Sequence, residues 1–242
     1  ISTYKILLEK KPDNILVGQR LLSVYDSDKQ YDSALALAGR LHQLHKSNDG
    51  LLLYKVYFQS KLKEAISPKD VQKLQQSKRV ANHWLLNKAL GNQHYTNQRF
   101  VLAASEYQAA YDKQPSSINA VDLAKALALA GDSEKSTQLL EKHLTDNPQD
   151  TNVQVMLAGA YLNHKKEIEA ISLYEKALLT NPNNIIALNN LAYLKLKQDE
   201  NTEALSIIEK AVSLAPEVPA ILDTYGQALA ANDKLVESIA AY

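Results

Sequence analysis

The sequence predicts an all-α protein in which helical hairpins stack side by side into an α-solenoid. The first observation is composition: the 242 residues include only 7 Gly, too few for the turns of an all-β chain, and strong helix formers such as Ala, Leu and Lys dominate. The second is an internal period, because Pro115, Pro148, Pro182 and Pro216 are separated by 33, 34 and 34 residues. A single helix pair cannot bury its apolar face, so repeats of this length stabilise one another by stacking.

The overall composition excludes several classes of protein. Apolar residues make up 45% and charged residues 22% of the chain, a mixture typical of folded rather than disordered proteins. The 27 Lys and Arg balance 27 Asp and Glu, which argues against nucleic-acid or membrane-surface binding driven by net charge. The absence of Cys excludes disulfides, thiolate zinc sites and Cys nucleophiles. No apolar run reaches about 18 residues, so we expect no direct membrane insertion of this segment.

The period divides the chain into successive units, each predicted to form two helices, A and B. In one unit, apolar and small residues fall at helical spacing around Leu157 and again at Ala170 and Tyr174. Pairs such as Asn181-Pro182 end helix B, because the residue before Pro avoids the helical region. The predicted single array over 1–242 comprises a half repeat at 1–14, repeats at 15–48, 84–116, 117–150, 151–184 and 185–218, an irregular repeat at 49–83 and a truncated repeat at 219–242.

The pattern within these units resembles the tetratricopeptide repeat (TPR), a unit of about 34 residues with Leu-Gly in helix A, Ala-x3-Phe in helix B and a closing Pro. In 84–116 the corresponding residues are Leu90-Gly91, Ala103, Tyr107 and Pro115. The resemblance is close over 84–242 and weaker over 1–83. It implies a right-handed superhelix of stacked helix-turn-helix repeats whose concave face is made mainly by helix A.

The repeat at 49–83 keeps the repeat length but loses the Leu-Gly and Ala-x3-Phe residues. The run Ser67-Pro68-Lys69-Asp70 predicts a helix start, with Ser67 as N-cap and Pro68 in the first turn. This start lies a few residues later than that of a regular helix B, so we expect a longer A–B connection. Two interpretations stay open: sequence drift without a purpose, and a bend that reshapes the groove.

The two ends of the chain predict that the sequence is a fragment of a longer array. The chain begins inside a predicted helix B and stops at Tyr242, inside another. Neither end has the polar capping helix that solenoids need for solubility. The alternatives are domain swapping and end-to-end packing of the apolar ends.

No motif of catalysis or metal binding is found along the chain. It lacks a Gly-rich phosphate loop, a nucleophile elbow and a His-Glu-x-x-His run. Asp26-x-Asp28 begins like a calcium loop, but Tyr31 and Leu37 replace the Gly and Glu that such a loop requires. His42 and His45 share a predicted helix face without a third ligand. The sequence therefore predicts no catalytic residue, no metal site and no cofactor.

The TPR resemblance implies that a peptide or protein segment binds along the concave groove lined by helix A of each repeat. Projecting the groove-facing positions onto this sequence gives a mixture in which Tyr and Asn are prominent. Tyr offers a large contact area at small entropic cost, and Asn both donates and accepts hydrogen bonds. The candidate partner-binding residues are Tyr57, Lys88, Asn92, Tyr95, Lys125, Asn152, Asn189 and Tyr193.

One group of TPR proteins binds the C-terminal carboxylates of chaperones through a clamp, and Lys88 with Asn92 matches its first part. The remaining positions do not match, since this chain has Asp122, Asn152 and Met156 where the clamp has Asn and two basic residues. Asp122 would repel a carboxylate, so the sequence argues against this clamp. Lys88 and Asn92 then belong either to the groove or to a solvated helix face.

Three segments resemble a narrower bacterial family, the long TPR proteins found with exosortase and PEP-CTERM sorting systems beside exopolysaccharide loci. They are 39–52, 188–193 and 221–226. This resemblance implies a location in the periplasm or cell envelope rather than the cytoplasm, and a role in export or assembly.

We therefore expect a non-catalytic scaffold whose partner is a protein or peptide, and not nucleic acid. A first alternative is a component of the polysaccharide-assembly machinery whose groove meets glycan or a secretion partner. A second alternative is a targeting arm for a catalytic domain elsewhere in a longer chain. Aromatic grooves also bind sugars by stacking, so the residues alone leave these alternatives open.

Overall fold

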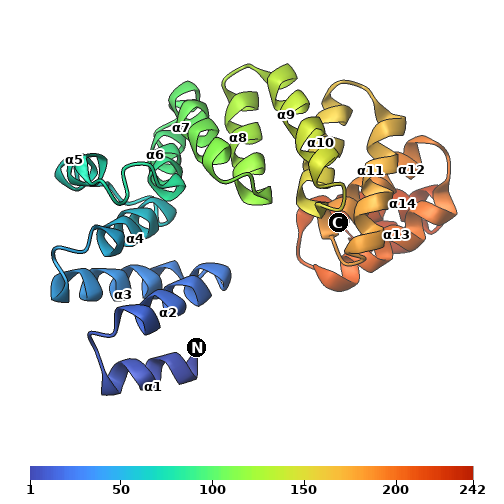
Figure 1. Cartoon of the computed structure of the whole chain (residues 1–242). Helices are drawn as coiled ribbons and strands as arrows, with labels where there is room; N and C mark the ends of the chain where they lie inside the picture. Colours follow the sequence, from blue (N-terminus) through green and yellow to red (C-terminus); the bar gives the residue numbers. More distant parts are fainter. Residues whose placement is uncertain (242) are drawn as a thin grey trace. The chain divides into compact units, whose positions relative to one another are not determined.

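Figure 1 shows the computed structural model, which describes residues 1–241. Over these residues the regular secondary structure consists of fifteen α-helices without a strand. The chain divides into two compact units, Ile1–Asp132 and Ser133–Tyr242. The predicted all-α class and α-solenoid fold are confirmed. The single array over 1–242 stays a prediction, and the last residue of its truncated repeat, Tyr242, lies outside the described residues.

The N-terminal unit is a row of helices in which each helix packs on its neighbours along the chain, with α5 set to one side (Figure 1). Its helices are α1 (Ser2–Lys10), α2 (Ile15–Ser27), α3 (Tyr31–Leu44), α4 (Asp49–Lys61), α5 (Pro68–Gln76), α6 (Trp84–Thr96), α7 (Phe100–Lys113) and α8 (Ser117–Leu129).

The C-terminal unit repeats the same packing of each helix on its neighbours. Its helices are α9 (Ser133–Asp146), α10 (Thr151–Asn163), α11 (Glu167–Thr180), α12 (Ile185–Lys197), α13 (Asn201–Leu214), α14 (Pro219–Ala231) and α15 (Leu235–Ala241). The division between the units falls between the two helices of the predicted repeat 117–150. Across residues 1–241, no helix combines the length and apolar character needed to cross a membrane.

The predicted repeat boundaries coincide with the starts of helices. The helices A (α2, α4, α6, α8, α10, α12 and α14) begin at the first residues of their repeats and have 13 residues each. The regular helices B (α3, α7, α9, α11 and α13) have 14 residues each. The sequence period therefore sets both the order and the length of the helices.

Side chains at the last position of several repeats cap the following helix A. Asn14 accepts a hydrogen bond from the backbone N–H of Val17 at 3.1 Å, which satisfies one of the unpaired donors of α2. Asp150 caps α10 in the same way through the N–H of Val153 at 3.2 Å. The other carboxylate oxygen of Asp150 lies 3.0 Å from Nε2 of the buried His143. A buried His is therefore accommodated between α9 and α10 by the last residue of its own repeat, which also caps the next helix A.

Every A–B turn contains one residue in the left-handed backbone region, with φ from 56° to 92°. It is always the fifteenth residue of its repeat, in the irregular repeat as well as in the regular ones. These residues are Lys29, Lys63, Gln98, Gly131, Lys165, Asp199 and Asp233. Gly adopts this region without steric cost, whereas a residue with a side chain does not. In six of the seven turns the left-handed residue is not Gly, so its backbone conformation is strained.

The irregular repeat has the longer A–B connection that the sequence predicts. α4 ends at Lys61, and α5 does not begin until Pro68. Ser67 occupies the predicted N-cap position, and its side chain makes no capping hydrogen bond with the helix. Pro68 at the first helical position still favours the start, because its fixed φ suits a helix and its missing N–H needs no partner.

Two ion pairs and a buried leucine attach α5 to the rest of the unit. Lys55 Nζ lies 3.1 Å from Asp70 Oδ2, and Lys73 Nζ lies 3.5 Å from Asp49 Oδ1. Leu74 is the one buried residue of this helix. Because α5 takes up little of the stacking surface, α4 packs directly against α6. The helix A of the irregular repeat and that of the following repeat are thereby brought together.

Gly91 lets α6 and α7 approach closely. A Cβ atom at this position would lie 2.5 Å from the ring of Tyr107, a distance that side chains do not tolerate. The glycine of the Leu-Gly pair therefore makes room for the aromatic residue of helix B. This contact holds the buried Tyr107 ring against α6.

Candidate partner-binding site

An open pocket of about 230 Å³ lies where the C-terminal ends of α4 and α6 approach α7 and α8 in the N-terminal unit. Three of the predicted groove residues, Asn92, Tyr95 and Lys125, line it. The full lining consists of Ser60, Lys61, Lys63, Asn92, Tyr95, Thr96, Tyr107, Asp122 and Lys125. The pocket is polar and aromatic, and most of its lining comes from helices A and the connection that follows α4.

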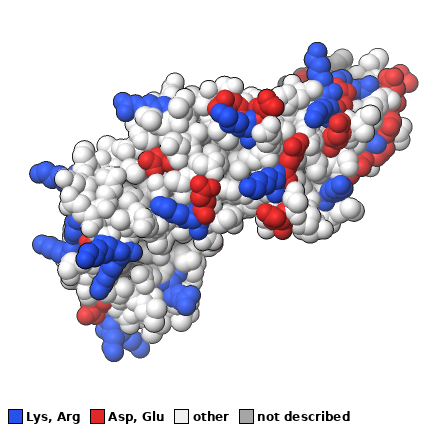
Figure 2. Space-filling model, turned by 45° about the horizontal axis from the view of Figure 1, so that its top comes forward, with Lys and Arg blue, Asp and Glu red and all other residues white. Residues whose placement is uncertain are grey.

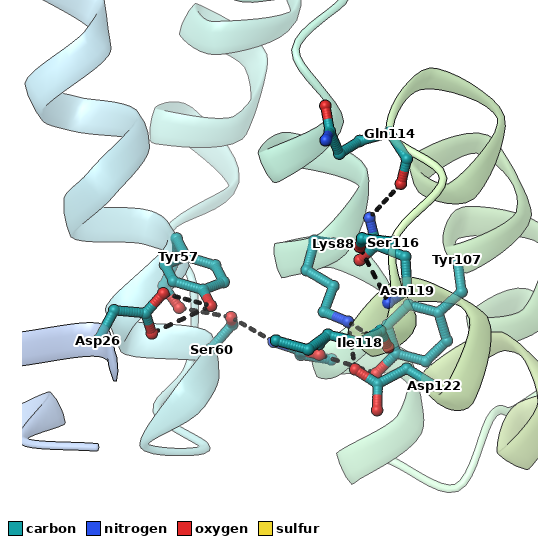
Figure 3. Close-up of polar contacts among 11 residues, drawn as sticks. Asp26, Tyr57, Ser60, Lys88, Tyr107, Gln114, Ser116, Ile118, Asn119 and Asp122 are labelled. Atoms are coloured by element: carbon teal, nitrogen blue, oxygen red, sulfur yellow. Dashed lines mark hydrogen bonds and ion pairs between the residues drawn. The ribbon is translucent and has the colours of Figure 1, made fainter. Parts of the chain in front are cut away.

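The pocket floor contains a buried ion pair. The Lys88 side chain is 1% exposed, and its ammonium group pairs with the carboxylate of Asp122, which is 28% exposed (Figure 3). Lys88 Nζ also lies 5.2 Å from the centre of the Tyr107 ring and donates to the backbone oxygen of Ile118 at 3.5 Å. Burial lowers the pKa of Lys88, and the adjacent Asp122 opposes this effect. The ion pair therefore joins α6 to α8 below the pocket.

Asn92 links three helices at the side of the pocket. Its Nδ2 donates to Ser60 Oγ on α4 at 3.0 Å, and its Oδ1 accepts from the Tyr107 hydroxyl on α7 at 2.8 Å. Ser60 Oγ in turn donates to the backbone oxygen of Tyr57 at 2.6 Å (Figure 3). These bonds fix the orientation of the Asn92 amide.

Tyr57 belongs to a second buried group next to this network. It is 5% exposed, and its hydroxyl donates to both carboxylate oxygens of Asp26, each at 3.2 Å (Figure 3). Burial raises the pKa of Asp26, while Lys61 and the hydrogen bond from Tyr57 act in the opposite direction. Lys61 Nζ lies 5.1 Å from the ring centre of Tyr31 and 5.7 Å from that of Tyr57. The Lys61 ammonium is therefore held by aromatic faces at the edge of the pocket.

The structure corrects the predicted position of two groove residues. Tyr57 and Lys88 lie beneath the surface, because the hydroxyl and the ammonium group are bound by Asp26 and Asp122. Helix A spacing alone does not reveal this, since it ignores what the neighbouring helices place opposite each position. Tyr95 and Lys125 do reach the surface, half-buried and exposed respectively. The Tyr95 ring meets Phe100 edge-on, with ring centres 5.4 Å apart.

Six lining residues are not among the predicted groove residues: Ser60, Lys61, Lys63, Thr96, Tyr107 and Asp122. Lys61 and Lys63 belong to the end of α4 and the unusual connection after it. Both occupy regular positions of the repeat, since Lys61 ends a helix A of 13 residues and Lys63 is the fifteenth residue, with positive φ. Both interpretations of the irregular repeat stay open.

The other three predicted residues lie in the C-terminal unit. Asn152 is exposed on α10. Asn189 and Tyr193 lie one turn apart on α12, where Tyr193 is 44% exposed. The Asn189 Oδ1 atom is buried without a hydrogen-bond partner among the described residues. Asn189 and Tyr193 therefore share one helix face, with Ile186 exposed on the preceding turn.

Residues 1–241 contain no group of three or more His, Asp or Glu side chains placed to hold a metal ion.

Comparisons with known proteins agree on a helical repeat. The profile of the ChAPs family, described as Chs5p-Arf1p-binding proteins, matches residues 113–221. The crystal structure of MamA protein aligns with a TM-score of 0.56 at 17% identity, covering 66% of this chain and 88% of that chain. MamA 41-end from Desulfovibrio magneticus RS-1 aligns with a TM-score of 0.56 at 16% identity, and the alignment covers 65% of this chain and 90% of that chain. Cut9 in the APC/C hetero-tetramer Cut9-Hcn1 aligns with a TM-score of 0.64 at 11% identity, and the alignment covers 97% of this chain and 46% of that chain. No curated protein sequence matches the chain.

The chain is a TPR-like helical repeat protein. At these identities, the similarity to MamA and Cut9 establishes the fold alone. The ChAPs match covers less than half of the chain and lies across both units. None of these matches includes an association with exosortase or PEP-CTERM systems, which stays a prediction.

Proposed function

We propose that this TPR-like chain is a non-catalytic scaffold that binds a segment of a partner protein in the pocket of the N-terminal unit. The observation that supports this most directly is the combination of a fixed floor and an open rim. Lys88 and Asn92 are held by ion-pair and hydrogen-bond partners, whereas Tyr95, Lys63 and Lys125 reach the surface. A surface ordered before binding loses little conformational entropy when a partner docks.

The comparisons support protein binding without naming a partner for this chain. The ChAPs family is described by its binding to Chs5p and Arf1p, and that description belongs to the family. TPR-like solenoids expose long rows of helix A side chains, which suits an extended segment of another protein. We include Asn152, Asn189 and Tyr193 of the C-terminal unit in the proposal as a separate contact surface for a partner.

An exopolysaccharide role is the alternative that the narrower resemblance suggests. Sugar binding requires an aromatic face free for stacking, together with several hydrogen-bonding groups beside it. Of the two lining rings, Tyr107 is 4% exposed and lies against Gly91, and Tyr95 is half-buried with an edge-to-face contact to Phe100, so the pocket offers no pair of open ring faces. We therefore propose a protein partner for this pocket and treat glycan binding as the outcome that would overturn it.

Site-specific photo-crosslinking tests this proposal. A photoreactive phenylalanine analogue replaces Tyr95, and in a matched control it replaces Val101, which is 71% exposed on α7 of the same unit. After irradiation in an extract of the source cell, we expect protein adducts at position 95 that map to one contiguous segment of a partner. The same adducts should weaken with Lys125→Ala. Equal adducts at both positions, or glycan adducts at position 95, would refute the proposal.

A further inference from the structure

The charge of the chain is divided unequally between its two units. Residues 1–132 contain 18 Lys and Arg against 12 Asp and Glu, and residues 133–242 contain 9 against 15. The N-terminal unit therefore has a net charge of +6 and the C-terminal unit of −6 with neutral His. Figure 2 shows mainly Lys and Arg side chains on the visible face of the N-terminal unit. The zero net charge of the whole chain conceals a basic unit around the pocket.

Within that basic unit, the pocket rim contains ammonium groups without a counter-ion. Three Lys line the pocket, and its one carboxylate, Asp122, already pairs with Lys88 on the floor. Lys63 and Lys125 are exposed, and neither side chain has an ion-pair or hydrogen-bond partner within residues 1–241. Two free positive charges therefore face a pocket whose only negative charge is occupied.

We propose that this pocket binds an acidic segment of a partner protein, with side-chain carboxylates of the segment meeting Lys63 and Lys125. The inference rests on the proposed function and adds the chemistry of the partner. The carboxylates bind at the rim because the buried Lys88 is saturated by Asp122. The end of a partner chain is therefore not required, and internal Asp or Glu residues suffice.

The neighbouring surface suits an extended backbone next to these carboxylates. A second hollow of about 120 Å³ shares Ser60, Lys63 and Thr96 with the pocket. It is also lined by the side chains of Gln93 and Asn97. Amide groups donate and accept hydrogen bonds, so they can pair with the main chain of a segment that passes Lys63. Lys63 lies between the two hollows and reaches both.

The same features favour a protein segment over a nucleic acid. A nucleic-acid backbone has regularly spaced phosphates and needs a continuous basic track. Here the second hollow contains Glu64 and the first contains Asp122, so negative side chains interrupt the track. Of the two aromatic rings in the lining, Tyr107 is buried and only Tyr95 reaches the surface, so successive bases find no row of rings to stack on. Separate carboxylates on a flexible chain can avoid these acidic positions.

Binding of two peptides to the full chain tests the inference. Both probes have about 12 residues, an amidated C-terminus and a fluorescent label, and they differ only in having four Glu or four Gln. We expect the Glu peptide to bind about tenfold more tightly at about 50 mM salt, and this preference to disappear near 500 mM because salt screens exposed charges. Lys63→Gln with Lys125→Gln should abolish the preference.

The matched control changes the net charge equally at a distance from the pocket. Lys69→Gln with Lys78→Gln removes two exposed Lys of the same unit that do not line either hollow. This variant should keep at least two thirds of the tenfold preference. Equal loss in both double variants would assign binding to overall charge and overturn the inference. Circular dichroism of each variant checks that the helices are intact.

Four other outcomes would also overturn the inference. If both peptides bind equally and depend on Tyr95, the pocket binds protein without selecting acid, and the proposed function survives alone. Absence of binding by the Glu peptide would reject acidic recognition, while the crosslinking at position 95 still decides the proposed function. Tighter binding of a single-stranded oligonucleotide of about 12 nucleotides would indicate a nucleic-acid site. Salt-sensitive self-association, lost with Lys63→Gln and Lys125→Gln, would assign the pocket to the acidic unit of a second copy.

Discussion

At the scale of single residues, the pocket depends on charges that the fold has buried. Lys88 is a candidate groove residue from its place on helix A, yet it is fully covered and bound to Asp122. Taking an ammonium group out of water is costly unless a counter-charge and further acceptors accompany it. Asp122, the backbone oxygen of Ile118 and the Tyr107 ring supply them. The pocket floor is therefore sensitive to the loss of a single carboxylate.

Asp122→Asn tests this dependence. The variant leaves the Lys88 ammonium buried without its counter-charge, so we expect the free energy of unfolding to fall by about 2 to 3 kcal/mol, less than for a fully buried pair because Asp122 is partly exposed. Urea unfolding at pH 7 measures the change. Lys88→Met combined with Asp122→Asn should recover most of the loss, because no charge is then buried. A single variant within about 0.5 kcal/mol of the original chain would contradict this account.

Asp26 provides a pH-dependent prediction. Burial raises its pKa, so the folded state keeps the proton at a higher pH than the unfolded state does. Its contribution to stability is therefore fully present below the ordinary pKa and is lost as pH rises through the raised folded pKa. We expect Asp26→Asn to increase the free energy of unfolding at pH 7, and the gain to vanish below about pH 4. Urea unfolding between these pH values measures it, with exposed Asp28→Asn as control. A gain that persists at low pH would exclude proton linkage.

At the scale of elements, the A–B turn is the most regular feature of the chain. The fifteenth residue of every described repeat has positive φ, even where the helix that follows is late and short. The composition of the turns hides this regularity, since only Gly131 is a glycine. The turn geometry is set by the packing of helices A and B, and a polar side chain then tolerates the strained conformation.

Lys165→Gly is expected to stabilise the chain. The left-handed conformation costs an L-residue about 1 to 2 kcal/mol, and the greater freedom of Gly in the unfolded chain offsets part of the gain. We expect the free energy of unfolding to rise by about 0.5 to 1 kcal/mol, measured by urea unfolding. Gly131→Ala is the reverse experiment and should lower it by about 1 kcal/mol, because φ is +92° there. Destabilisation by Lys165→Gly would show that its side chain makes a stabilising contact.

At the scale of the whole molecule, the sequence predicts the helices better than the surface they create. The prolines and small residues place every helix A at its observed start, because the period is a property of local sequence. The burial of Tyr57 depends instead on Asp26, which lies in the preceding repeat, and the rim position of Lys63 depends on lining residues from the repeats that follow. Such contacts between repeats are invisible to a pattern within one repeat. The charge separation also appears only once the two units are known.

Each unit has its own buried core, and this separation leads to a prediction about the cooperativity of unfolding. The buried cluster containing Leu41 and Leu52 lies within the N-terminal unit, whereas the cluster around Ile208 lies within the C-terminal unit. Solenoid stability is approximately a sum of neighbouring contacts, so damage to one core should stay local. Ile208→Ala removes a fully buried side chain and should lower the local free energy of opening by about 3 kcal/mol.

Amide hydrogen exchange measures the local free energy of opening helix by helix. With Ile208→Ala, we expect exchange to accelerate by about a hundredfold in α12 and α13, since 1.4 kcal/mol corresponds to about tenfold, and to stay unchanged in α3 and α4. Leu52→Ala is the matched experiment in the other core and should produce the opposite distribution. Equal acceleration in all helices with either variant would mean that residues 1–241 open as one cooperative unit. In that case a partner bound in the N-terminal pocket would also stabilise the C-terminal unit, because ligand binding protects everything that unfolds together with its site.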